Sequence, residues 1–477
     1  MARRAERREI ARASAHGWRV VLLLVAAYAA ACAVALALGF DHISDDDFAR
    51  VTIAQAFAHR PRLDPSGTSW LPAPFWALGS VMLVFGRSLA VARWASVAMA
   101  SLAAALPYLA LRGTGATRGR ALGAAAFAML SPWSVWLGAA TVPEAVVASA
   151  TAGAAIALGA RAGAGAGARA GARAGAGAGA RAGAGAGARA LFAVAMFAAC
   201  LSRYEPWPVA AVLAVVLARR AWTERSAGSI ACVVLVAAGP LLWIGWNAYA
   251  HGDALHFFAR VSRFKQSIGE GSVDTVAALL LYPRLLVTTR PDVVLAVTCA
   301  GAAAWKLLDR EEVRARWTVP LICTAAQIAF LAYGNARDGA PAHHAERALL
   351  GATFILAAFA ADVLAAAAPV AWARGRAPAI GGVAVVLLGA WAFTTLRALG
   401  DVPGAGPTED RAPQIARGNA LRAARATELV VTPCAYEHFA LIAAYGAPER
   451  VETRPRADDA GTATGPGTAT CPAVERR

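Results

Sequence analysis

The stretch VVLLLVAAYAAACAVALALGF, residues 20–40, is apolar throughout and follows a basic N-terminus, residues 1–19. A hydrocarbon core of roughly 30 Å needs about 20 apolar residues in helical conformation, so this run is long enough to cross a bilayer. It exceeds the apolar core of a usual secretory signal, although Ala33-Val34-Ala35 is similar to a signal-peptidase site. The stretch therefore favours an uncleaved anchor with a cytoplasmic N-terminus, because basic segments are poorly translocated.

The whole chain has the composition of a membrane protein. Of its 477 residues, 58% are hydrophobic and 16% are charged, whereas soluble proteins carry roughly a quarter of charged residues. The formal net charge of +16 comes mostly from arginines in short segments between apolar runs, and no basic domain could dock a nucleic acid. We expect these arginines to mark cytoplasmic loops, and we expect no nucleic-acid partner.

Further apolar runs, most of them close to spanning length, follow the first one. They cover residues 88–111, 121–137, 142–158, 191–218, 229–249, 293–308, 319–333, 348–367 and 380–396. With a break inside one run, they predict an all-α polytopic membrane protein with about eleven transmembrane helices over residues 20–396. The basic segments predict an orientation in the plasma (inner) membrane with the C-terminus outside the cytoplasm.

The run at residues 191–218 contains the break and allows two interpretations, because Arg203, Glu205 and Pro206 interrupt it. One long helix would place Arg203 and Glu205 near the bilayer centre, at roughly 2.5 to 3.5 kcal/mol for each charged residue. Two short helices would place them at a polar mouth, and proline disfavours an unbroken helix. We predict two helices. This choice puts the basic stretch 251–290 outside, against the positive-inside tendency, which long loops follow less strictly.

Three segments complete the organisation outside the predicted helices. Residues 41–85 form the first outer loop and carry an acidic cluster. Residues 160–190 repeat Ala, Gly and Arg, which predicts a flexible cytoplasmic loop that is either an inert expansion or a contact to anionic membrane lipids. The tail, residues 397–477, predicts a small extracytoplasmic α/β domain. A disulfide between Cys434 and Cys471 would require an oxidising compartment there.

The predicted topology gathers the notable polar residues on the outer side, and these are the candidate functional residues. They are Asp45, Asp46, Asp47, Glu144, Arg203, Tyr204, Glu205, His344 and Arg347. Structural roles stay open beside functional ones. Ser44 and Asp47 form a capping-box pattern, Glu144 follows a proline and could cap a helix, and Arg203 could pair with Glu205 alone.

The order of these motifs resembles the GT-C glycosyltransferases, which include protein O-mannosyltransferases and the bacterial lipid A aminoarabinose transferase. The similar segments are Asp45-Asp46-Asp47-Phe48-Ala49-Arg50, Trp70-Leu71-Pro72-Ala73-Pro74-Phe75, Leu130-Ser131-Pro132, Pro143-Glu144 and Ser202-Arg203-Tyr204-Glu205. The resemblance covers roughly residues 20–350 with short motifs. It implies a GT-C-like fold and transfer of a sugar from a polyprenyl-phosphate carrier to a glycan, lipid or protein acceptor at the outer face, with inversion.

The resemblance also implies roles for the candidate residues. Asp45 or Asp46 would be the catalytic base. Arg203 and Arg347 would bind near the departing phosphate, with substrate-binding roles for Asp47, Glu144, Tyr204, Glu205 and His344. Metal dependence stays open, because Asp45 and Asp47 form an Asp-x-Asp pair, whereas the adjacent His343 and His344 make a poor metal pair. A lipid-linked sugar flippase and a non-catalytic scaffold are the alternatives.

Overall fold

The computed structural model of the chain describes residues 2–160, 178–267, 274–338, 344–406, 409–431, 436–454 and 475–476. The described residues are mainly helical and divide into two compact units. Unit 1 comprises Met1–Ala31, Ala100–Val135 and Glu144–Gly400, and unit 2 comprises Cys32–Met99, Trp136–Pro143 and Asp401–Arg477. Predictions for Cys434, Cys471, His343 and residues 161–177 lie outside the described residues.

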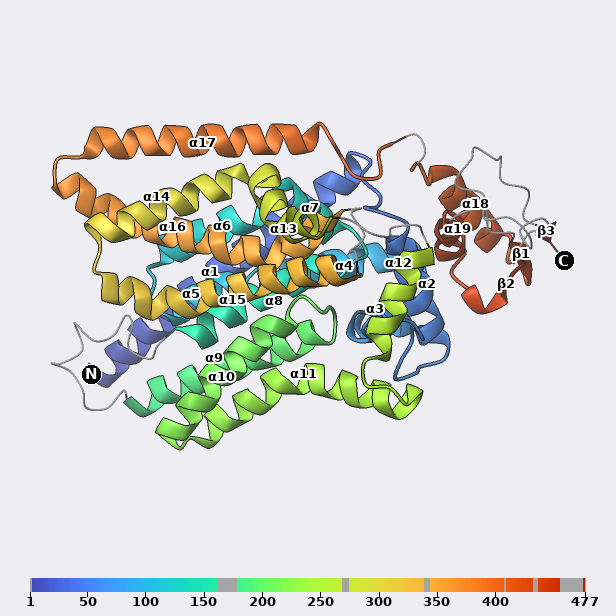
Figure 1. Cartoon of the computed structure of the whole chain (residues 1–477), viewed down its shortest axis with the longest axis horizontal. Helices are drawn as coiled ribbons and strands as arrows, with labels where there is room; N and C mark the ends of the chain where they lie inside the picture. Colours follow the sequence, from blue (N-terminus) through green and yellow to red (C-terminus); the bar gives the residue numbers. More distant parts are fainter. Residues whose placement is uncertain are drawn as a thin grey trace. The chain divides into compact units, whose positions relative to one another are not determined.

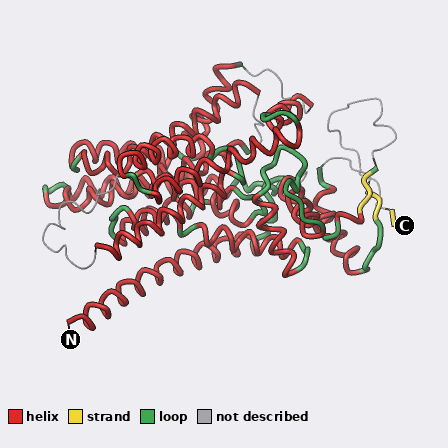
Figure 2. The backbone as a smooth tube through the Cα atoms, turned by 90° about the horizontal axis from the view of Figure 1, so that it is seen from below, coloured by secondary structure: helices red, strands yellow, loops and turns green. Residues whose placement is uncertain are grey.

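Most of unit 1 is a bundle of apolar helices that lie side by side (Figures 1 and 2). Its elements, some of which continue into unit 2 at one end, are α1 (Ala2–Ala37), α5 (Leu106–Gly113), α6 (Arg118–Met129), α7 (Pro132–Ala139), α8 (Glu144–Gly159), α9 (Ala178–Cys200), α10 (Trp207–Glu224), α11 (Ala227–His251), α12 (His256–Ser267), α13 (Thr275–Thr289), α14 (Pro291–Leu307), α15 (Arg310–Asp338), η1 (Ala345–Leu349), α16 (Leu350–Ala373) and α17 (Ala377–Leu399).

The prediction of an all-α polytopic membrane protein is confirmed. In the described residues, six helices are long and apolar enough to cross a membrane, or up to eight if each of two bent helix pairs is one span. This number is smaller than the predicted eleven, because two predicted spans form the shorter apolar helices Glu144–Gly159 and Gly187–Cys200, and α10 (Trp207–Glu224) is not among the candidate spans. A third short apolar helix, Ala73–Phe85, lies in the predicted loop of residues 41–85. The predicted break is also confirmed: α9 ends at Cys200, and α10 begins at Trp207.

The loop prediction for residues 160–190 is wrong at its C-terminal side, because α9 already begins at Ala178. Two properties of the repeat explain the helix: it is rich in alanine, and it runs directly into an apolar helix. Alanine has the highest helix propensity, and the apolar helix that follows supplies a nucleus onto which each added residue contributes one hydrogen bond. The glycine content of the repeat alone was therefore a poor guide here.

At one end of unit 1, arginine side chains form hydrogen bonds with carbonyl groups at the ends of neighbouring helices. Arg220 near the end of α10 donates to the carbonyl of Leu158 at the end of α8, at 2.8 Å. Arg374 beyond α16 donates to the carbonyl of Lys306 in the last turn of α14, at 3.3 Å. The α8 end also packs close to the beginning of α15, since Gly159 lies against Val319. All of these segments fall on the side predicted to be cytoplasmic, and we call this the basic end.

Unit 2 combines the segment after the first apolar helix, predicted to be an outer loop, with the C-terminal tail. Its elements are α2 (Asp46–His59), α3 (Ala73–Phe85), α4 (Leu89–Ala103), α18 (Ala412–Ala423), α19 (His438–Tyr445), η2 (Pro448–Arg450) and the strands β1 (Leu429–Val431), β2 (Val451–Thr453) and β3 (Glu475–Arg476). The sheet order is β2-β1-β3, with β1 parallel to β2 and antiparallel to β3. Leu429 pairs with both Val451 and Arg476. The tail thus contains the predicted α and β elements.

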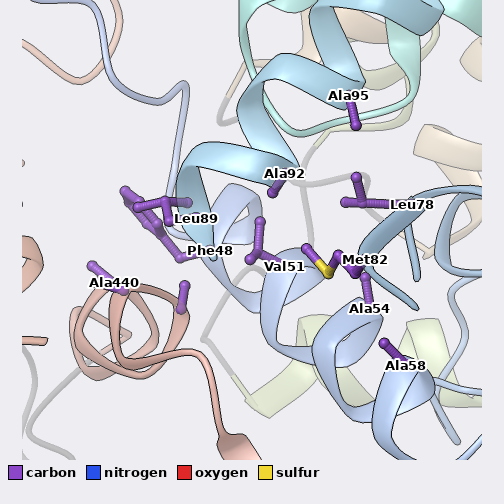
Figure 3. Packing of buried hydrophobic residues seen from close by; sticks show 12 residues of the cluster. Phe48, Val51, Ala54, Ala58, Leu78, Met82, Leu89, Ala92, Ala95 and Ala440 are labelled. Carbon is purple, nitrogen blue, oxygen red and sulfur yellow. The ribbon is translucent and has the colours of Figure 1, made fainter. Parts of the chain in front are cut away.

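An apolar core joins the tail to the first loop within unit 2. Figure 3 shows Phe48 and Val51 of α2, Met82 of α3 and Ala440 of α19 gathered around one interior. Phe48 is 1% exposed, and burying such a side chain contributes about 1.5 to 3 kcal/mol. At the edge of this core the Gln55 side chain donates to the carbonyl of Ala443 at 2.7 Å. The tail is therefore packed against the loop and is not a separate domain.

Candidate functional site

One group of candidate residues lies in unit 1, at the end of α8 away from the basic end. Glu144 is the first residue of α8 and is 2% exposed. A carboxylate is favoured there, because the N-terminal turn of a helix presents unsatisfied N–H groups and a positive partial charge. Arg203 and Glu205 lie in the turn between α9 and α10, and Pro206 precedes the first residue of α10. The proline that favoured the break thus positions both charged residues in the connecting turn.

Four charged side chains, Glu144, Arg203, Glu205 and Arg347, converge here and form what we call the arginine–glutamate cluster. Arg203 donates from Nη1 to Oε1 of Glu144 at 2.6 Å. It also donates from Nε to both oxygens of Glu205, at 2.9 and 3.0 Å. Arg347 Nη1 lies 4.0 Å from the same Glu144 oxygen. One guanidinium therefore bridges two carboxylates, and a second stands at ion-pair distance.

The arginine–glutamate cluster is tightly packed in this conformation. The cavity beside it has a volume of about 10 Å³ and is lined also by Gln327, Leu350 and Gly351. A single water molecule needs about that much room. A Cβ at Gly351 would lie 3.3 Å from the Gln327 amide, so the Gln327 side chain packs closely against this glycine. A larger ligand could enter only after these side chains move.

Tyr204 is held in an aromatic group beside the turn. Its ring stacks on Phe257 of α12 at 5.0 Å between centroids, and its hydroxyl accepts a hydrogen bond from Trp243 of α11 at 3.2 Å. Trp207 packs edge-on against both stacked rings. These contacts fix the α9–α10 turn, and through it the backbone that carries Arg203.

His344 shapes the turn that carries Arg347. It adopts a left-handed backbone conformation with φ of 54° immediately before η1. Its carbonyl accepts a hydrogen bond from Nε of Arg347 at 3.4 Å, and its ring lies 3.8 Å from Glu346 and 5.9 Å from the Trp133 ring centroid. Within the described residues, no group of three or more His, Cys, Asp or Glu side chains could hold a metal ion.

A separate group of candidate residues lies in the acidic loop of unit 2. Asp47 is 1% exposed, and its carboxylate accepts hydrogen bonds from the backbone N–H groups of Ile43, Ser44 and Thr141 at 3.2 to 3.3 Å. The bond from Ser44 is the acidic half of the predicted capping box. Asp47 thus fixes the beginning of α2.

Asp45 pairs with a residue that the sequence did not single out. Arg411, which precedes α18 in the tail, donates to both carboxylate oxygens of Asp45, at 2.7 and 2.8 Å. The hydrogen bond and charge of Asp45 raise the pKa of Arg411 above its ordinary value despite partial burial. Asp46 is half-buried in the first turn of α2. No spacing or local pattern relates positions 45 and 411, so only the tertiary fold shows this pair.

The residues around Asp45 are also charged. His42, 1% exposed, lies 2.5 Å from the Asp41 carboxylate. Burial lowers the pKa of His42. The hydrogen bond and charge of Asp41, together with the charges of Asp47 and Asp45, raise it by more, so the pKa of His42 lies above its ordinary value. Arg93 donates to the carbonyl of Asp41 at 3.0 Å.

Comparison with known proteins gives no assignment. No protein-family model matches the chain, and no curated protein matches it by sequence. The structure brings Glu144, Arg203, Glu205 and Arg347 together in unit 1, with His344 beside them, and it places Asp45, Asp46 and Asp47 at the beginning of α2 in unit 2.

Proposed function

We propose that the chain is a GT-C type glycosyltransferase of about eleven spans in the plasma membrane. It would move a sugar from a polyprenyl-phosphate carrier to a glycan, lipid or protein acceptor on the outer face. One observation carries most of this proposal. The arginine–glutamate cluster draws two arginines and two glutamates from three separate segments to one end of an apolar bundle. Charged groups in such surroundings are costly, and they usually mark a functional site.

The proposed reaction requires fixed positive charge close to the carrier phosphate, which is the leaving group. Arginine suits this task, because its planar fork can donate two parallel hydrogen bonds to a phosphate. Arg203 and Arg347 both stand at Glu144, so a phosphate would bind by replacing a carboxylate oxygen as their partner. The positive charge would then meet the negative charge that develops on the leaving oxygen.

The acceptor needs a base as its hydroxyl attacks the anomeric carbon. In the proposed step the acceptor oxygen bonds to that carbon, and the bond to the carrier phosphate breaks on the opposite face, which inverts the centre. The hydroxyl proton passes to Asp45 or Asp46. The pair with Arg411 would hold Asp45 ionised and oriented. Because Asp47 is bound by backbone N–H groups and Asp45 by Arg411, we expect activity to persist in a chelator.

The decisive experiment compares Asp45→Asn, Asp46→Asn and the double variant in membrane vesicles supplied with a panel of polyprenyl-phosphate sugars. Release of free polyprenyl phosphate is the readout, so the acceptor need not be known. We expect the variant that lacks the base to lose about 10²- to 10⁴-fold in rate. Asp64→Asn is the matched control, because Asp64 belongs to the same outer loop and bonds only to its own turn in the described contacts.

A lipid-linked sugar flippase is the alternative, and the same vesicles separate the two functions. A transporter would carry the labelled donor across the membrane intact, and the double variant would leave that movement unchanged. Movement of donor without release of polyprenyl phosphate from any sugar in the panel contradicts the enzymatic proposal. Neither movement nor release, in wild type and variants alike, would favour a non-catalytic scaffold.

A further inference from the structure

A second buried charged group lies in unit 1, toward the basic end, and it does not take part in the proposed reaction. Asp362 of α16 is 1% exposed. Its carboxylate accepts hydrogen bonds from Arg120 of α6 at 2.9 Å, from Arg316 of α15 at 3.1 Å and from the Trp317 indole at 3.1 Å. Side chains from three helices thus meet at one carboxylate.

The charges in this group do not balance. Two guanidinium groups face a single buried carboxylate, and Arg316 is itself only 3% exposed. The Nε atom of Arg316 has no hydrogen-bond partner among the described residues. Glu312 forms an ion pair with Arg316 at 3.5 Å, but its side chain is 53% exposed, so it neutralises the buried guanidinium only in part. An excess cation in a poorly solvated place is costly, so the group is suited to an additional anion.

A cavity opens beside this charged group. Its volume is about 430 Å³, which is within the range of about 300 to 1,000 Å³ that small-molecule sites occupy. Its lining includes the charged residues Arg120, Arg316 and Asp362 and the apolar residues Val363 and Pro369. Pro369 lies two turns beyond Asp362 on α16, so these two residues are about 10 Å apart along the helix.

The surroundings indicate a membrane surface rather than open water. Trp305 in the last turns of α14 and Trp372 in the last turn of α16 are 63% and 69% exposed. Exposed tryptophans at helix ends typically lie at the level of lipid headgroups. Lys306 and Arg374, which are in contact at these same ends, add positive charge.

We propose that this cavity binds the headgroup of a zwitterionic aminophospholipid. The phosphate would lie toward Arg120 and Arg316, where it supplies the missing anion. The ammonium group would lie toward two acids of the lining, Asp309 and Glu312, and the glycerol and upper acyl chains would follow its apolar residues. Asp309 and Glu312 disfavour headgroups that carry a net negative charge, so phosphatidylethanolamine is preferred over phosphatidylglycerol.

The test uses the full chain in nanodiscs of phosphatidylcholine mixed with either phosphatidylethanolamine or phosphatidylglycerol, followed by native mass spectrometry of retained lipid. Arg316→Gln removes the excess cation and leaves Asp362 paired with Arg120. It should lower retention of phosphatidylethanolamine about tenfold, as expected for loss of a charge-assisted hydrogen bond. Arg314→Gln is the matched control, because Arg314 lies on the same helix, is exposed and does not line the cavity.

A second variant keeps the test decisive if Arg316→Gln folds poorly. Glu312→Gln changes an exposed residue of the lining, and it should shift retention from phosphatidylethanolamine toward phosphatidylglycerol. Inorganic phosphate added to lipid-depleted protein distinguishes the sources of the anion. Protection against thermal unfolding by phosphate alone, abolished by Arg316→Gln, would replace the lipid with a free anion and overturn the proposal. Equal lipid retention in wild type, Arg316→Gln and Glu312→Gln would also overturn it.

Discussion

Arg411 and Asp45 are 366 positions apart in the chain, yet the Arg411 guanidinium donates to both oxygens of the Asp45 carboxylate. Arg411 immediately precedes α18, and Asp45 immediately precedes α2. The pair therefore ties the beginning of the tail to the beginning of the first helix in the outer loop. Both side chains are only partly exposed, at 10% and 20%, so solvent weakens the interaction less than at an open surface.

Arg411→Gln should reduce the free energy of unfolding of unit 2 by about 1 to 3 kcal/mol, because a bidentate charged pair is lost and Asp45 stays partly buried. Thermal unfolding and proteolysis of the tail measure the change, with the exposed Arg450→Gln as control. A double-mutant cycle with Asp45→Asn isolates the pair. Purely additive losses in that cycle would show that the two residues do not stabilise each other.

The His42 site predicts that the docking of the tail depends on pH. The pKa of His42 is raised above 6.5 in the folded chain, so its contribution to stability is fully present below that value and is lost as the pH rises through the folded pKa. Gly404 of the tail, with φ of 75°, approaches the carbonyl and ring of His42 so closely that a Cβ would lie 2.5 Å from the carbonyl oxygen. Loosening at His42 should therefore be felt at the beginning of the tail.

Thermal unfolding measured from pH 6 upward checks this dependence. The wild-type midpoint should fall with rising pH, and His42→Gln should flatten the curve, because the glutamine does not titrate there. The carboxylates that act on the imidazole are those of Asp41, Asp47 and Asp45, and Arg93 donates to the backbone carbonyl of Asp41. Parallel curves for wild type and His42→Gln would assign the pH dependence to another group.

The sequence predicted the features that depend on solvation by lipid, namely the apolar helices and the break between α9 and α10. The apolar lengths predicted the helices, and the cost of burying Arg203 and Glu205 predicted the break that α9 and α10 confirm. The convergence of Arg203 with Glu144 also followed from topology, because both lie at helix ends on one predicted side. These properties depend on local composition and on the alternation of helix ends.

The sequence could not predict the contacts that depend on tertiary packing. Arg411 is one of many arginines, and nothing in its neighbours relates it to Asp45. The same limit applies to Asp362, whose partners Arg120 and Arg316 come from two other helices. The substrate-binding role expected for Asp47 stays a prediction. Its carboxylate, in a residue that is 1% exposed, accepts hydrogen bonds from backbone N–H groups, which agrees with the capping-box pattern.

Gly418 allows the two tail helices, α18 and α19, to pack closely against each other. A Cβ on this residue of α18 would lie 2.3 Å from the carbonyl oxygen of Leu441 in α19 and 2.7 Å from the Cβ of Ala444. Gly418→Ala should therefore separate the helices and destabilise the tail by about 1 to 3 kcal/mol. Gly406→Ala is the control, because its Cβ would meet only ordinary contacts with Glu409. Equal protease resistance of both variants would contradict the packing argument.

Arg203→Lys tests whether the geometry of the arginine–glutamate cluster matters as much as its charge. Lysine keeps the positive charge, but its compact ammonium group cannot present the planar fork with which Arg203 binds Glu144 and Glu205 together. We expect the free energy of unfolding to fall by about 1 to 3 kcal/mol. Arg219→Lys, an exposed position near the end of α10, is the matched control and should change little.

The same variant separates a structural role of the cluster from a role in the reaction. If Arg203 also binds the carrier phosphate, release of polyprenyl phosphate should fall in Arg203→Lys even under conditions where the protein stays folded. Glu144→Gln provides the complement, because it removes the shared carboxylate at 2.6 Å from Arg203 and leaves the arginine fork intact. It should destabilise the bundle more than Arg203→Lys, since Glu144 is the most buried member. Loss of stability without any loss of release in folded Arg203→Lys would make the cluster a structural element only.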